Sequence, residues 1–298
     1  MNTIETFLQY VLNGLVIGSG YTLLALGLSL IFAVMKTVNF AHGELYMLGA
    51  YVTYTMIESF HIPFLVALPM SMIILAAFGG LLERFVFRPL ANDKDRHKEM
   101  TNQFIVSLGL VIFFQYAASL IWGPDPQKMT TPFSGIVLRV GEVTITFERL
   151  LIVIMAVVLI LGLYFLIQKT TLGMAMRAVA LDRDTANLMG VKVSKVSTLS
   201  FSIGTALAAA AGGLMGPVFM VAPGMGAALI MKAFVVIILG GLGSVFGTIA
   251  GGLLLGITES LVGAYWLNQY TDPIGFLLII VLLMVKPTGL FGKVERHA

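Results

Sequence analysis

The feature that most constrains this chain is a series of apolar stretches, each about 18 to 25 residues long. An α-helix needs roughly 20 apolar residues to cross the ~30 Å hydrocarbon core of a bilayer, so these stretches predict membrane-spanning helices. They lack the alternating pattern over ~10 residues that is typical of outer-membrane barrel strands. Only 11% of the residues are charged, whereas soluble domains carry roughly 25%. We therefore predict an all-α integral membrane protein.

The apolar stretches predict eight to nine transmembrane helices within one transmembrane domain that covers residues 1–298. The eight longer ones are roughly 8–33, 43–58, 62–82, 103–122, 150–167, 196–216, 244–263 and 273–291, and 226–240 is a shorter ninth. The first stretch precedes the first basic residue, Lys36. It therefore lacks the positive start of a signal peptide, and we expect it to be retained as a span.

Basic residues indicate which loops face the cytoplasm. The segments 84–102 and 169–195, together with the tail from 286, hold 13 of the 18 lysines and arginines. The positive-inside rule makes these segments cytoplasmic, so 123–148 is external. Its three prolines and its alternating run LRVGEVTITF predict a small lid or hairpin. With Lys36 inside, the N-terminus is external and 226–240 is a full crossing, whereas a re-entrant 226–240 requires the opposite N-terminus.

The sequence carries no motif for nucleotide binding or catalysis. There is no GxxxxGK[ST], HExxH or GxSxG, and the string GLGSVFGT at 241–248 lacks the phosphate-binding lysine. The histidines have no metal-ligand spacing, and they are His42, His61, His97 and His297. We therefore expect no catalytic residue, no metal site and no cofactor. If the chain moves a solute uphill, the energy has to come from an ion gradient or from another polypeptide.

A few polar residues fall inside the predicted spans. Asn39, His42 and Glu44 stand at the head of one span, Glu259 is late in another, and Lys232 lies in 226–240. In one interpretation the first three cap a helix start at the membrane interface. In the other they line a translocation path, because ionisable groups inside a membrane are commonly functional. Isolated groups of this kind offer little support for an ion-driven carrier.

Small residues recur every four positions in two spans. The two stripes are Gly204, Ala208, Gly212 and Gly216, and Gly243, Gly247 and Gly251. Such stripes let helices approach closely, and static packing is their simplest interpretation. Prolines and glycines break the chain on both sides of 226–240, and broken helices at membrane depth occur where protein covers them or where they line a cavity. We therefore predict a pathway wall over 217–247, with Gly241 and Ser244 as path candidates.

The polar segment RAVALDRDTANLMGVKV, residues 177–193, contrasts with these spans. We expect the preceding span to end at Leu172 and Gly173. Asp182 is a suitable N-cap for a short helix from Arg183 to Met189, which Gly190 would end. Its predicted apolar edge consists of Ala186, Leu188 and Met189. A helix that docks in a groove of a cytosolic partner fits this pattern, and a membrane-surface helix is the alternative, weakened by two aspartates.

Several long strings resemble one family over nearly the whole chain. They are VNFAHGELYMLGAY (38–51), TTLGMAMRAVALDRDTANLMGVKV (170–193), GGLMGPVF (212–219) and MKAFVVIILGGLGSVFGTIAGGLLLGITES (231–260). The chain resembles the inner-membrane permeases of ATP-binding-cassette importers for branched-chain amino acids, specifically the H-type subunit of the Liv systems.

The resemblance implies a set of partners and a role for the polar segment. The implied partners are a second, homologous permease that forms a heterodimer, two cytosolic ATP-binding subunits, a periplasmic solute-binding protein and the surrounding lipid bilayer. No nucleic acid is implied. The segment becomes the coupling helix seated in an ATPase cleft, carried by Arg177, Asp182, Arg183, Ala186, Leu188, Met189 and Gly190.

The substrate and the mode of energy supply leave alternatives open. Permeases of this family also serve urea, short amides and other amino acids, and the sparse polar residues do not select among these. A secondary carrier driven by an ion gradient and a scaffold or channel subunit are the alternatives from other classes.

Overall fold

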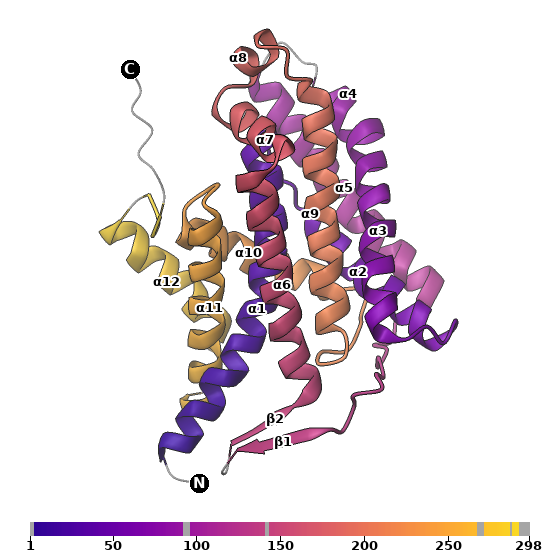
Figure 1. Ribbon diagram of the computed structural model, residues 1–298, viewed down its shortest axis with the longest axis vertical. Coiled ribbons are helices and arrows are strands. Elements are labelled where there is room, and N and C mark those ends of the chain that lie inside the picture. Colours follow the sequence, from indigo (N-terminus) through magenta and orange to yellow (C-terminus); the bar gives the residue numbers. More distant parts are fainter. Residues whose placement is uncertain (1–2, 92–95, 141–142, 267–270, 287, 292–298) are drawn as a thin grey trace.

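The computed structural model describes residues 3–91, 96–140, 143–266, 271–286 and 288–291 as a helical bundle with one short hairpin (Figure 1). Its longer helices are α1 (Thr3–Met35), α2 (His42–Glu58), α3 (Phe64–Leu82), α5 (Arg96–Trp122), α6 (Phe147–Lys169), α9 (Val193–Met215), α10 (Met225–Gly240), α11 (Val245–Tyr265) and α12 (Thr271–Val285). Within the described residues, six helices are long and apolar enough to cross a membrane, and α10 and α12 are shorter apolar helices. The predicted all-α membrane fold is confirmed.

The start of α1 and the hairpin lie at one end of the bundle (Figure 1). Strand β1 (Val137–Val140) pairs antiparallel with β2 (Val143–Thr146), which confirms the predicted hairpin, although its turn at 141–142 lies outside the described residues. The amide of Gln9 in α1 donates to the Thr144 carbonyl, and its oxygen accepts from the Thr144 N–H, both at 2.8 Å. We call this the hairpin end.

The opposite end carries two short helices, α7 (Thr171–Leu181) and α8 (Arg183–Leu188) (Figure 1). Here α3 continues through a π-helical turn, Glu83–Phe87, into α4 (Arg88–Leu90). The guanidinium of Arg88 pairs with Glu83 at 2.7 Å and also donates to Thr198 in α9. Arg88 also donates to the Ser194 carbonyl, and Arg183 pairs with Glu99. The described residues of 84–102 and the segment 169–195 therefore lie together at this end, which we call the α8 end.

Two predicted boundaries at the α8 end are wrong. The sequence predicts a loop over 84–102, but the π-helical turn, α4 and the start of α5 occupy most of this segment, and Lys94 lies outside the described residues. The span before the polar segment ends at Lys169 rather than at Leu172 and Gly173, because α7 begins at Thr171. The tail residues Lys293 and Arg296 lie outside the described residues.

Glycines let the central helices pack backbone against backbone. A Cβ on Gly18 of α1 would lie 2.8 Å from the Gly252 carbonyl oxygen of α11. A Cβ on Gly204 of α9 would lie 2.7 Å from the Gly27 carbonyl oxygen of α1. A Cβ on Gly212 of α9 would collide with the Tyr46 carbonyl of α2. The predicted stripe in α9 is therefore a packing face, as expected for helices that associate inside a membrane. In the second stripe Gly247 and Gly251 pack on α10, whereas Gly243 lies in the turn before α11.

Helix α2 begins inside the bundle rather than at its surface. After α1 ends at Met35, residues 36–41 are not helical, and Lys36 adopts a left-handed φ of 58°. The ring of His42 then lies 3.3 Å from the carbonyl oxygen of Leu24. Leu24 precedes Met35, the last residue of α1, by 35 − 24 = 11 residues. At a rise of 1.5 Å per residue, this separation is about 16 Å along the helix axis. The chain therefore turns back into the protein, which covers its non-helical backbone.

Candidate functional site

The predicted polar residues at the head of α2 lie in the protein interior. His42 and Glu44 are fully buried and Asn39 nearly so. The residue that precedes the helix is Ala41, not Asn39 as predicted, but the Asn39 side-chain oxygen accepts a hydrogen bond from the Ala41 N–H at 3.0 Å. Glu44 accepts from the amide of Gln115 in α5 at 3.0 Å. Such burial does not fit the interpretation of His42 and Glu44 as interfacial caps.

Each of these three side chains retains one polar atom without a hydrogen-bond partner in the described part of the chain. The atoms are Asn39 Nδ2, His42 Nδ1 and Glu44 Oε2. A buried polar atom left without a partner costs about 1–3 kcal/mol. Three of them in six consecutive residues mark a place that can exchange hydrogen bonds with water or a polar solute.

Helix α10 packs directly on this polar group. A Cβ placed on Gly226 of α10 would lie 2.9 Å from Glu44 Oε2, and Gly226 and Gly43 approach each other through their backbones. The ring of Phe234 in α10 lies 4.9 Å from that of Phe40, centroid to centroid. Residues 226–234 of α10 and residues 40–44 around the start of α2 therefore form one contact surface.

On another face, α10 carries half of an ion pair. Lys232 Nζ lies 2.7 Å from Glu259 Oε1 of α11, and the Tyr21 hydroxyl of α1 donates to Glu259 Oε2 at 2.7 Å. The Lys232 side chain is 19% exposed and the Glu259 side chain is 7% exposed. The sequence indicated the two charges separately but not their pairing, nor the roles of Tyr21 and Gln115. Opposite charges in neighbouring apolar spans were the available signal, because intramembrane charges tend to pair.

Gly241 and Ser244 lie away from the polar group, in the turn between α10 and α11. Gly241 ends α10 with a φ of 95°, and the Ser244 hydroxyl caps α11 by accepting from the Gly247 N–H at 3.1 Å. Gly243 of this turn faces Ala33 near the end of α1, where a Cβ on the glycine would lie 3.9 Å from the alanine Cβ. Of the predicted path candidates, the structure therefore groups Asn39, His42 and Glu44, and places Glu259 on the far side of α10.

The short helix α8 forms as its sequence predicts. One Asp182 oxygen accepts from the N–H groups of Asp184 and Thr185 at 2.9 and 3.1 Å. Gly190 follows the helix with a φ of 86°. At this position a non-glycine residue would be strained. Arg183 pairs with Glu99 of α5 at 3.7 Å.

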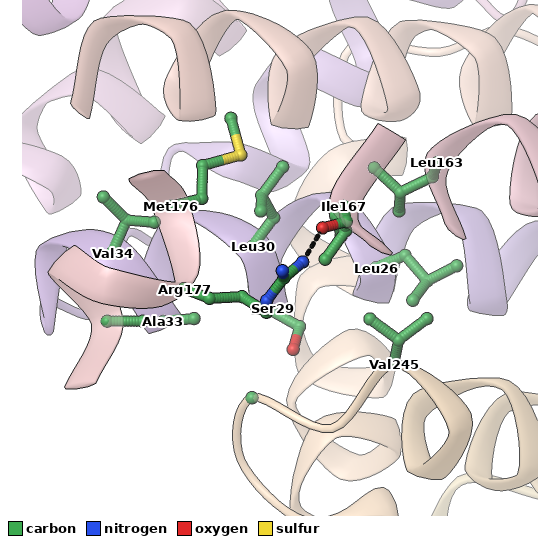
Figure 2. A pocket seen from close by; sticks show the side chains of 12 residues that line it. Leu26, Ser29, Leu30, Ala33, Val34, Leu163, Ile167, Met176, Arg177 and Val245 are labelled. Atoms are coloured by element: carbon green, nitrogen blue, oxygen red, sulfur yellow. Dashed lines mark hydrogen bonds between the residues drawn. The ribbon is translucent and has the colours of Figure 1, made fainter. Parts of the chain in front are cut away.

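Two residues assigned to the coupling helix behave differently from the prediction. Ala186 is only 5% exposed, so it faces the bundle and does not share an edge with Leu188 and Met189, which are 86% and 80% exposed. Ala186 faces inward because α8 uses it to rest on the bundle. Arg177 belongs to α7 rather than α8, and its guanidinium donates to the Ile167 carbonyl of α6 (Figure 2).

Comparison with known proteins defines the class. A model of the family described as "Branched-chain amino acid transport system / permease component" matches residues 10–285. The high-affinity branched-chain amino acid transport system permease protein BraD of Pseudomonas aeruginosa is 34% identical, covering 99% of both chains. The corresponding protein LivH of Escherichia coli (strain K12) is 36% identical, covering 97% of this chain and 96% of the relative. No solved structure matches the chain.

These matches identify first a class and then a family. The chain is a multi-pass membrane permease, the non-catalytic membrane subunit of an ATP-binding-cassette transport system, and it is located in the inner membrane. It belongs to the family of branched-chain amino acid transport permeases.

Proposed function

We propose that this permease moves branched-chain amino acids from the periplasm to the cytoplasm under the drive of separate ATP-binding subunits. The names of BraD and LivH, which match over nearly the full chain, support this substrate. The proposed assembly contains a second, homologous permease, two cytosolic ATP-binding subunits and a periplasmic solute-binding protein. Residues 1–298 act in it as one transmembrane domain, with the α8 end cytoplasmic and the hairpin end external.

The observation that carries the coupling role is the exposed tip of α8. The helix is capped at both ends, so its shape does not depend on a partner. Leu188 and Met189 nevertheless project from it almost fully exposed. Apolar anchors on a rigid helix are typical of a helix that docks in a groove, and a cytosolic ATP-binding subunit provides one.

A movement of α8 has a direct route to the buried polar group. The N–H of Val191, just after α8, donates to the Ala186 carbonyl at 3.0 Å, and α9 begins two residues later. Further along α9, a Cβ on Gly212 would collide with the Tyr46 carbonyl of α2. Since α2 begins at His42, a rigid shift of α9 would displace the head of α2 against Gly226 of α10. We propose that this contact opens and closes the path, with Asn39, His42 and Glu44 along it.

The coupling proposal is tested in the assembled importer, reconstituted in vesicles. Met189→Glu places a charge in the proposed apolar contact. ATP-driven leucine uptake is expected to fall at least about tenfold, which is the loss expected when an anchor residue of an interface is changed. Met189→Leu is the matched control and is expected to retain uptake, because it preserves the apolar volume. If Met189→Glu took up leucine as fast as the wild type, with the same amount of importer in the vesicles, the coupling role would be refuted.

The energy source and the substrate are tested separately. The purified chain alone, in liposomes with a proton or sodium gradient and no ATP, is expected to show no leucine uptake. Uptake under those conditions would favour an ion-driven carrier. In the full importer, excess isoleucine or valine is expected to compete with labelled leucine. Stronger competition by urea or a short amide would replace the proposed substrate with one of those alternatives.

A further inference from the structure

A small crevice lies at the α8 end between α1, α6, α7 and the turn that joins α10 to α11 (Figure 2). Its volume is about 100 Å³. Most of the wall is aliphatic or thioether side chain, and the larger contributors are Leu26, Leu30, Val34, Leu163, Met176 and Val245. The polar side chains in the wall are those of Ser29 and Arg177. The crevice is distinct from the polar group at the head of α2, since none of the residues in that group lines it.

Arg177 places a positive charge in this apolar wall. Its guanidinium donates to the Ile167 carbonyl in the last turn of α6, as the dashed line in Figure 2 shows. The residue is otherwise exposed, and no carboxylate among the described residues pairs with it. A guanidinium has five N–H donors in a planar fork that suits a phosphate. The arginine can therefore keep its contact with Ile167 and still bind an anion.

The surface beside the crevice has the composition of a membrane-facing surface. Phe246, next to the wall residue Val245, is exposed, and Leu161 and Phe165 continue the exposed apolar surface on the other side of α6. Tyr164, next to the wall residue Leu163, packs edge-to-face against Phe246, with ring centroids 5.5 Å apart. Aromatic residues near the ends of spans are typical of the level where hydrocarbon meets lipid headgroups. The apolar wall thus lies at acyl-chain depth, and Arg177 lies toward the headgroups.

We infer that this crevice binds one anionic phospholipid of the cytoplasmic leaflet, with an acyl chain against the aliphatic wall and the phosphate on Arg177. The leaflet is negatively charged, and basic pockets between spanning helices on the cytoplasmic side bind anionic headgroups. Charge complementarity favours this occupant over a zwitterionic lipid, because the headgroup cation of the latter offsets the attraction between its phosphate and Arg177. A protein partner would cover the same wall without requiring a particular headgroup.

The test compares two lipids on the full chain, purified in a mild detergent. Native mass spectrometry measures retention of phosphatidylglycerol and of phosphatidylcholine with the same acyl chains. The wild type is expected to prefer phosphatidylglycerol. Arg177→Gln is expected to weaken that binding about fivefold, the effect of one basic residue near an anionic headgroup, and to weaken phosphatidylcholine binding less than twofold, because its choline cation already offsets the phosphate charge. Arg177→Lys is expected to keep most of the preference, which separates loss of charge from misfolding.

Two further variants make the result specific. Lys169→Gln removes an exposed charge at the end of α6, at the same end of the bundle but outside the crevice wall, and is expected to change binding less than twofold. Ala33→Leu fills the crevice and is expected to reduce retention of both lipids. Equal retention of the two lipids by the wild type would overturn the inference. So would equal losses in Lys169→Gln and Arg177→Gln, or undiminished lipid retention in a folded Ala33→Leu.

Discussion

Helix α10 and helix α8 are both short elements between long spans, but they are held in opposite ways. Helix α10 is packed into the bundle, with Gly240 against Gly247, Gly226 against Gly43 and Lys232 paired with Glu259. Helix α8 rests on the bundle through Ala186 and is shaped mainly by its own caps.

This difference predicts two kinds of mutational effect. In α10 and its neighbours, stability and transport should fall together, because the contacts that hold the fold also border the proposed path. At the tip of α8, transport should fall while stability stays the same. Four variants are ordered below by their expected effect on stability. Recovery of folded protein measures the first, and the melting temperature of the purified protein together with ATP-driven uptake measures the other three.

The largest effect is expected where a side chain would meet backbone in the interior. In Gly212→Val the new Cβ would collide with the carbonyl of Tyr46. Adding volume to a packed interior costs about 1–3 kcal/mol, and more where the obstacle is backbone. We therefore expect little folded protein to be recovered. The measurement is size-exclusion chromatography in detergent, in which folded protein elutes as a single symmetric peak and that peak is expected to be small or absent.

The matched control is a glycine on a free helix face. Gly109 in α5 has no atom within 4 Å of an added Cβ. Gly109→Ala is therefore expected to leave the protein folded, with a slight gain because alanine favours helix by roughly 1 kcal/mol. Normal recovery of Gly212→Val would show that α9 and α2 are packed less tightly than the structure indicates.

The second effect concerns the ion pair between α10 and α11. Glu259→Leu leaves the Lys232 ammonium without its carboxylate, and breaking one side of a buried pair costs about 3–5 kcal/mol. The double change Lys232→Met with Glu259→Leu removes both charges and is expected to cost less than the single change. A double variant less stable than Glu259→Leu would contradict the cost assigned to a lysine left without this carboxylate.

The region that was predicted well from sequence is the one that depends on local interactions. Two residues, Asp182 as the N-cap and Gly190 as the terminating glycine, were sufficient to predict α8, because helix caps act within one turn. Span length predicted the membrane helices for a similar reason, since each span is set by its own apolar residues. Within α8, the side that carries Ala186 was predicted wrongly, because the orientation of a helix depends on what it rests on.

The arrangement around α10 could not be predicted in this way because it is set by contacts between distant segments. The sequence marked Glu44 and Glu259 as candidates, but it did not indicate that Gln115 bonds the first or that Lys232 and Tyr21 bond the second. It also did not predict that α2 begins about 16 Å inside the bundle. That depth follows from how far residues 36–41 run back along α1, which no local pattern encodes.

The third prediction weakens α8 through its cap. Asp182→Ala removes the acceptor for the N–H groups of Asp184 and Thr185, and loss of such a cap typically costs about 1 kcal/mol. We expect a small or undetectable shift in melting temperature with partial loss of uptake, because a frayed α8 couples less well. Asp184→Ala is the control, since its side chain is not the cap, and it should retain more uptake. A large fall in melting temperature would mean that α8 supports the bundle.

The smallest effect on stability is expected for Leu188→Ala, which tests the difference between α8 and α10 most directly. Leu188 is 86% exposed, so its truncation should change the free energy of unfolding by less than about 0.5 kcal/mol. Uptake should still fall severalfold, because the side chain is a proposed anchor for the ATP-binding subunit. Leu120 in α5 is 89% exposed toward the hairpin end of its helix, and Leu120→Ala should change neither quantity. Equal uptake by both alanine variants would mean that exposure alone, and not position on α8, distinguishes Leu188, and the coupling contact would then have to be sought elsewhere on the α8 end.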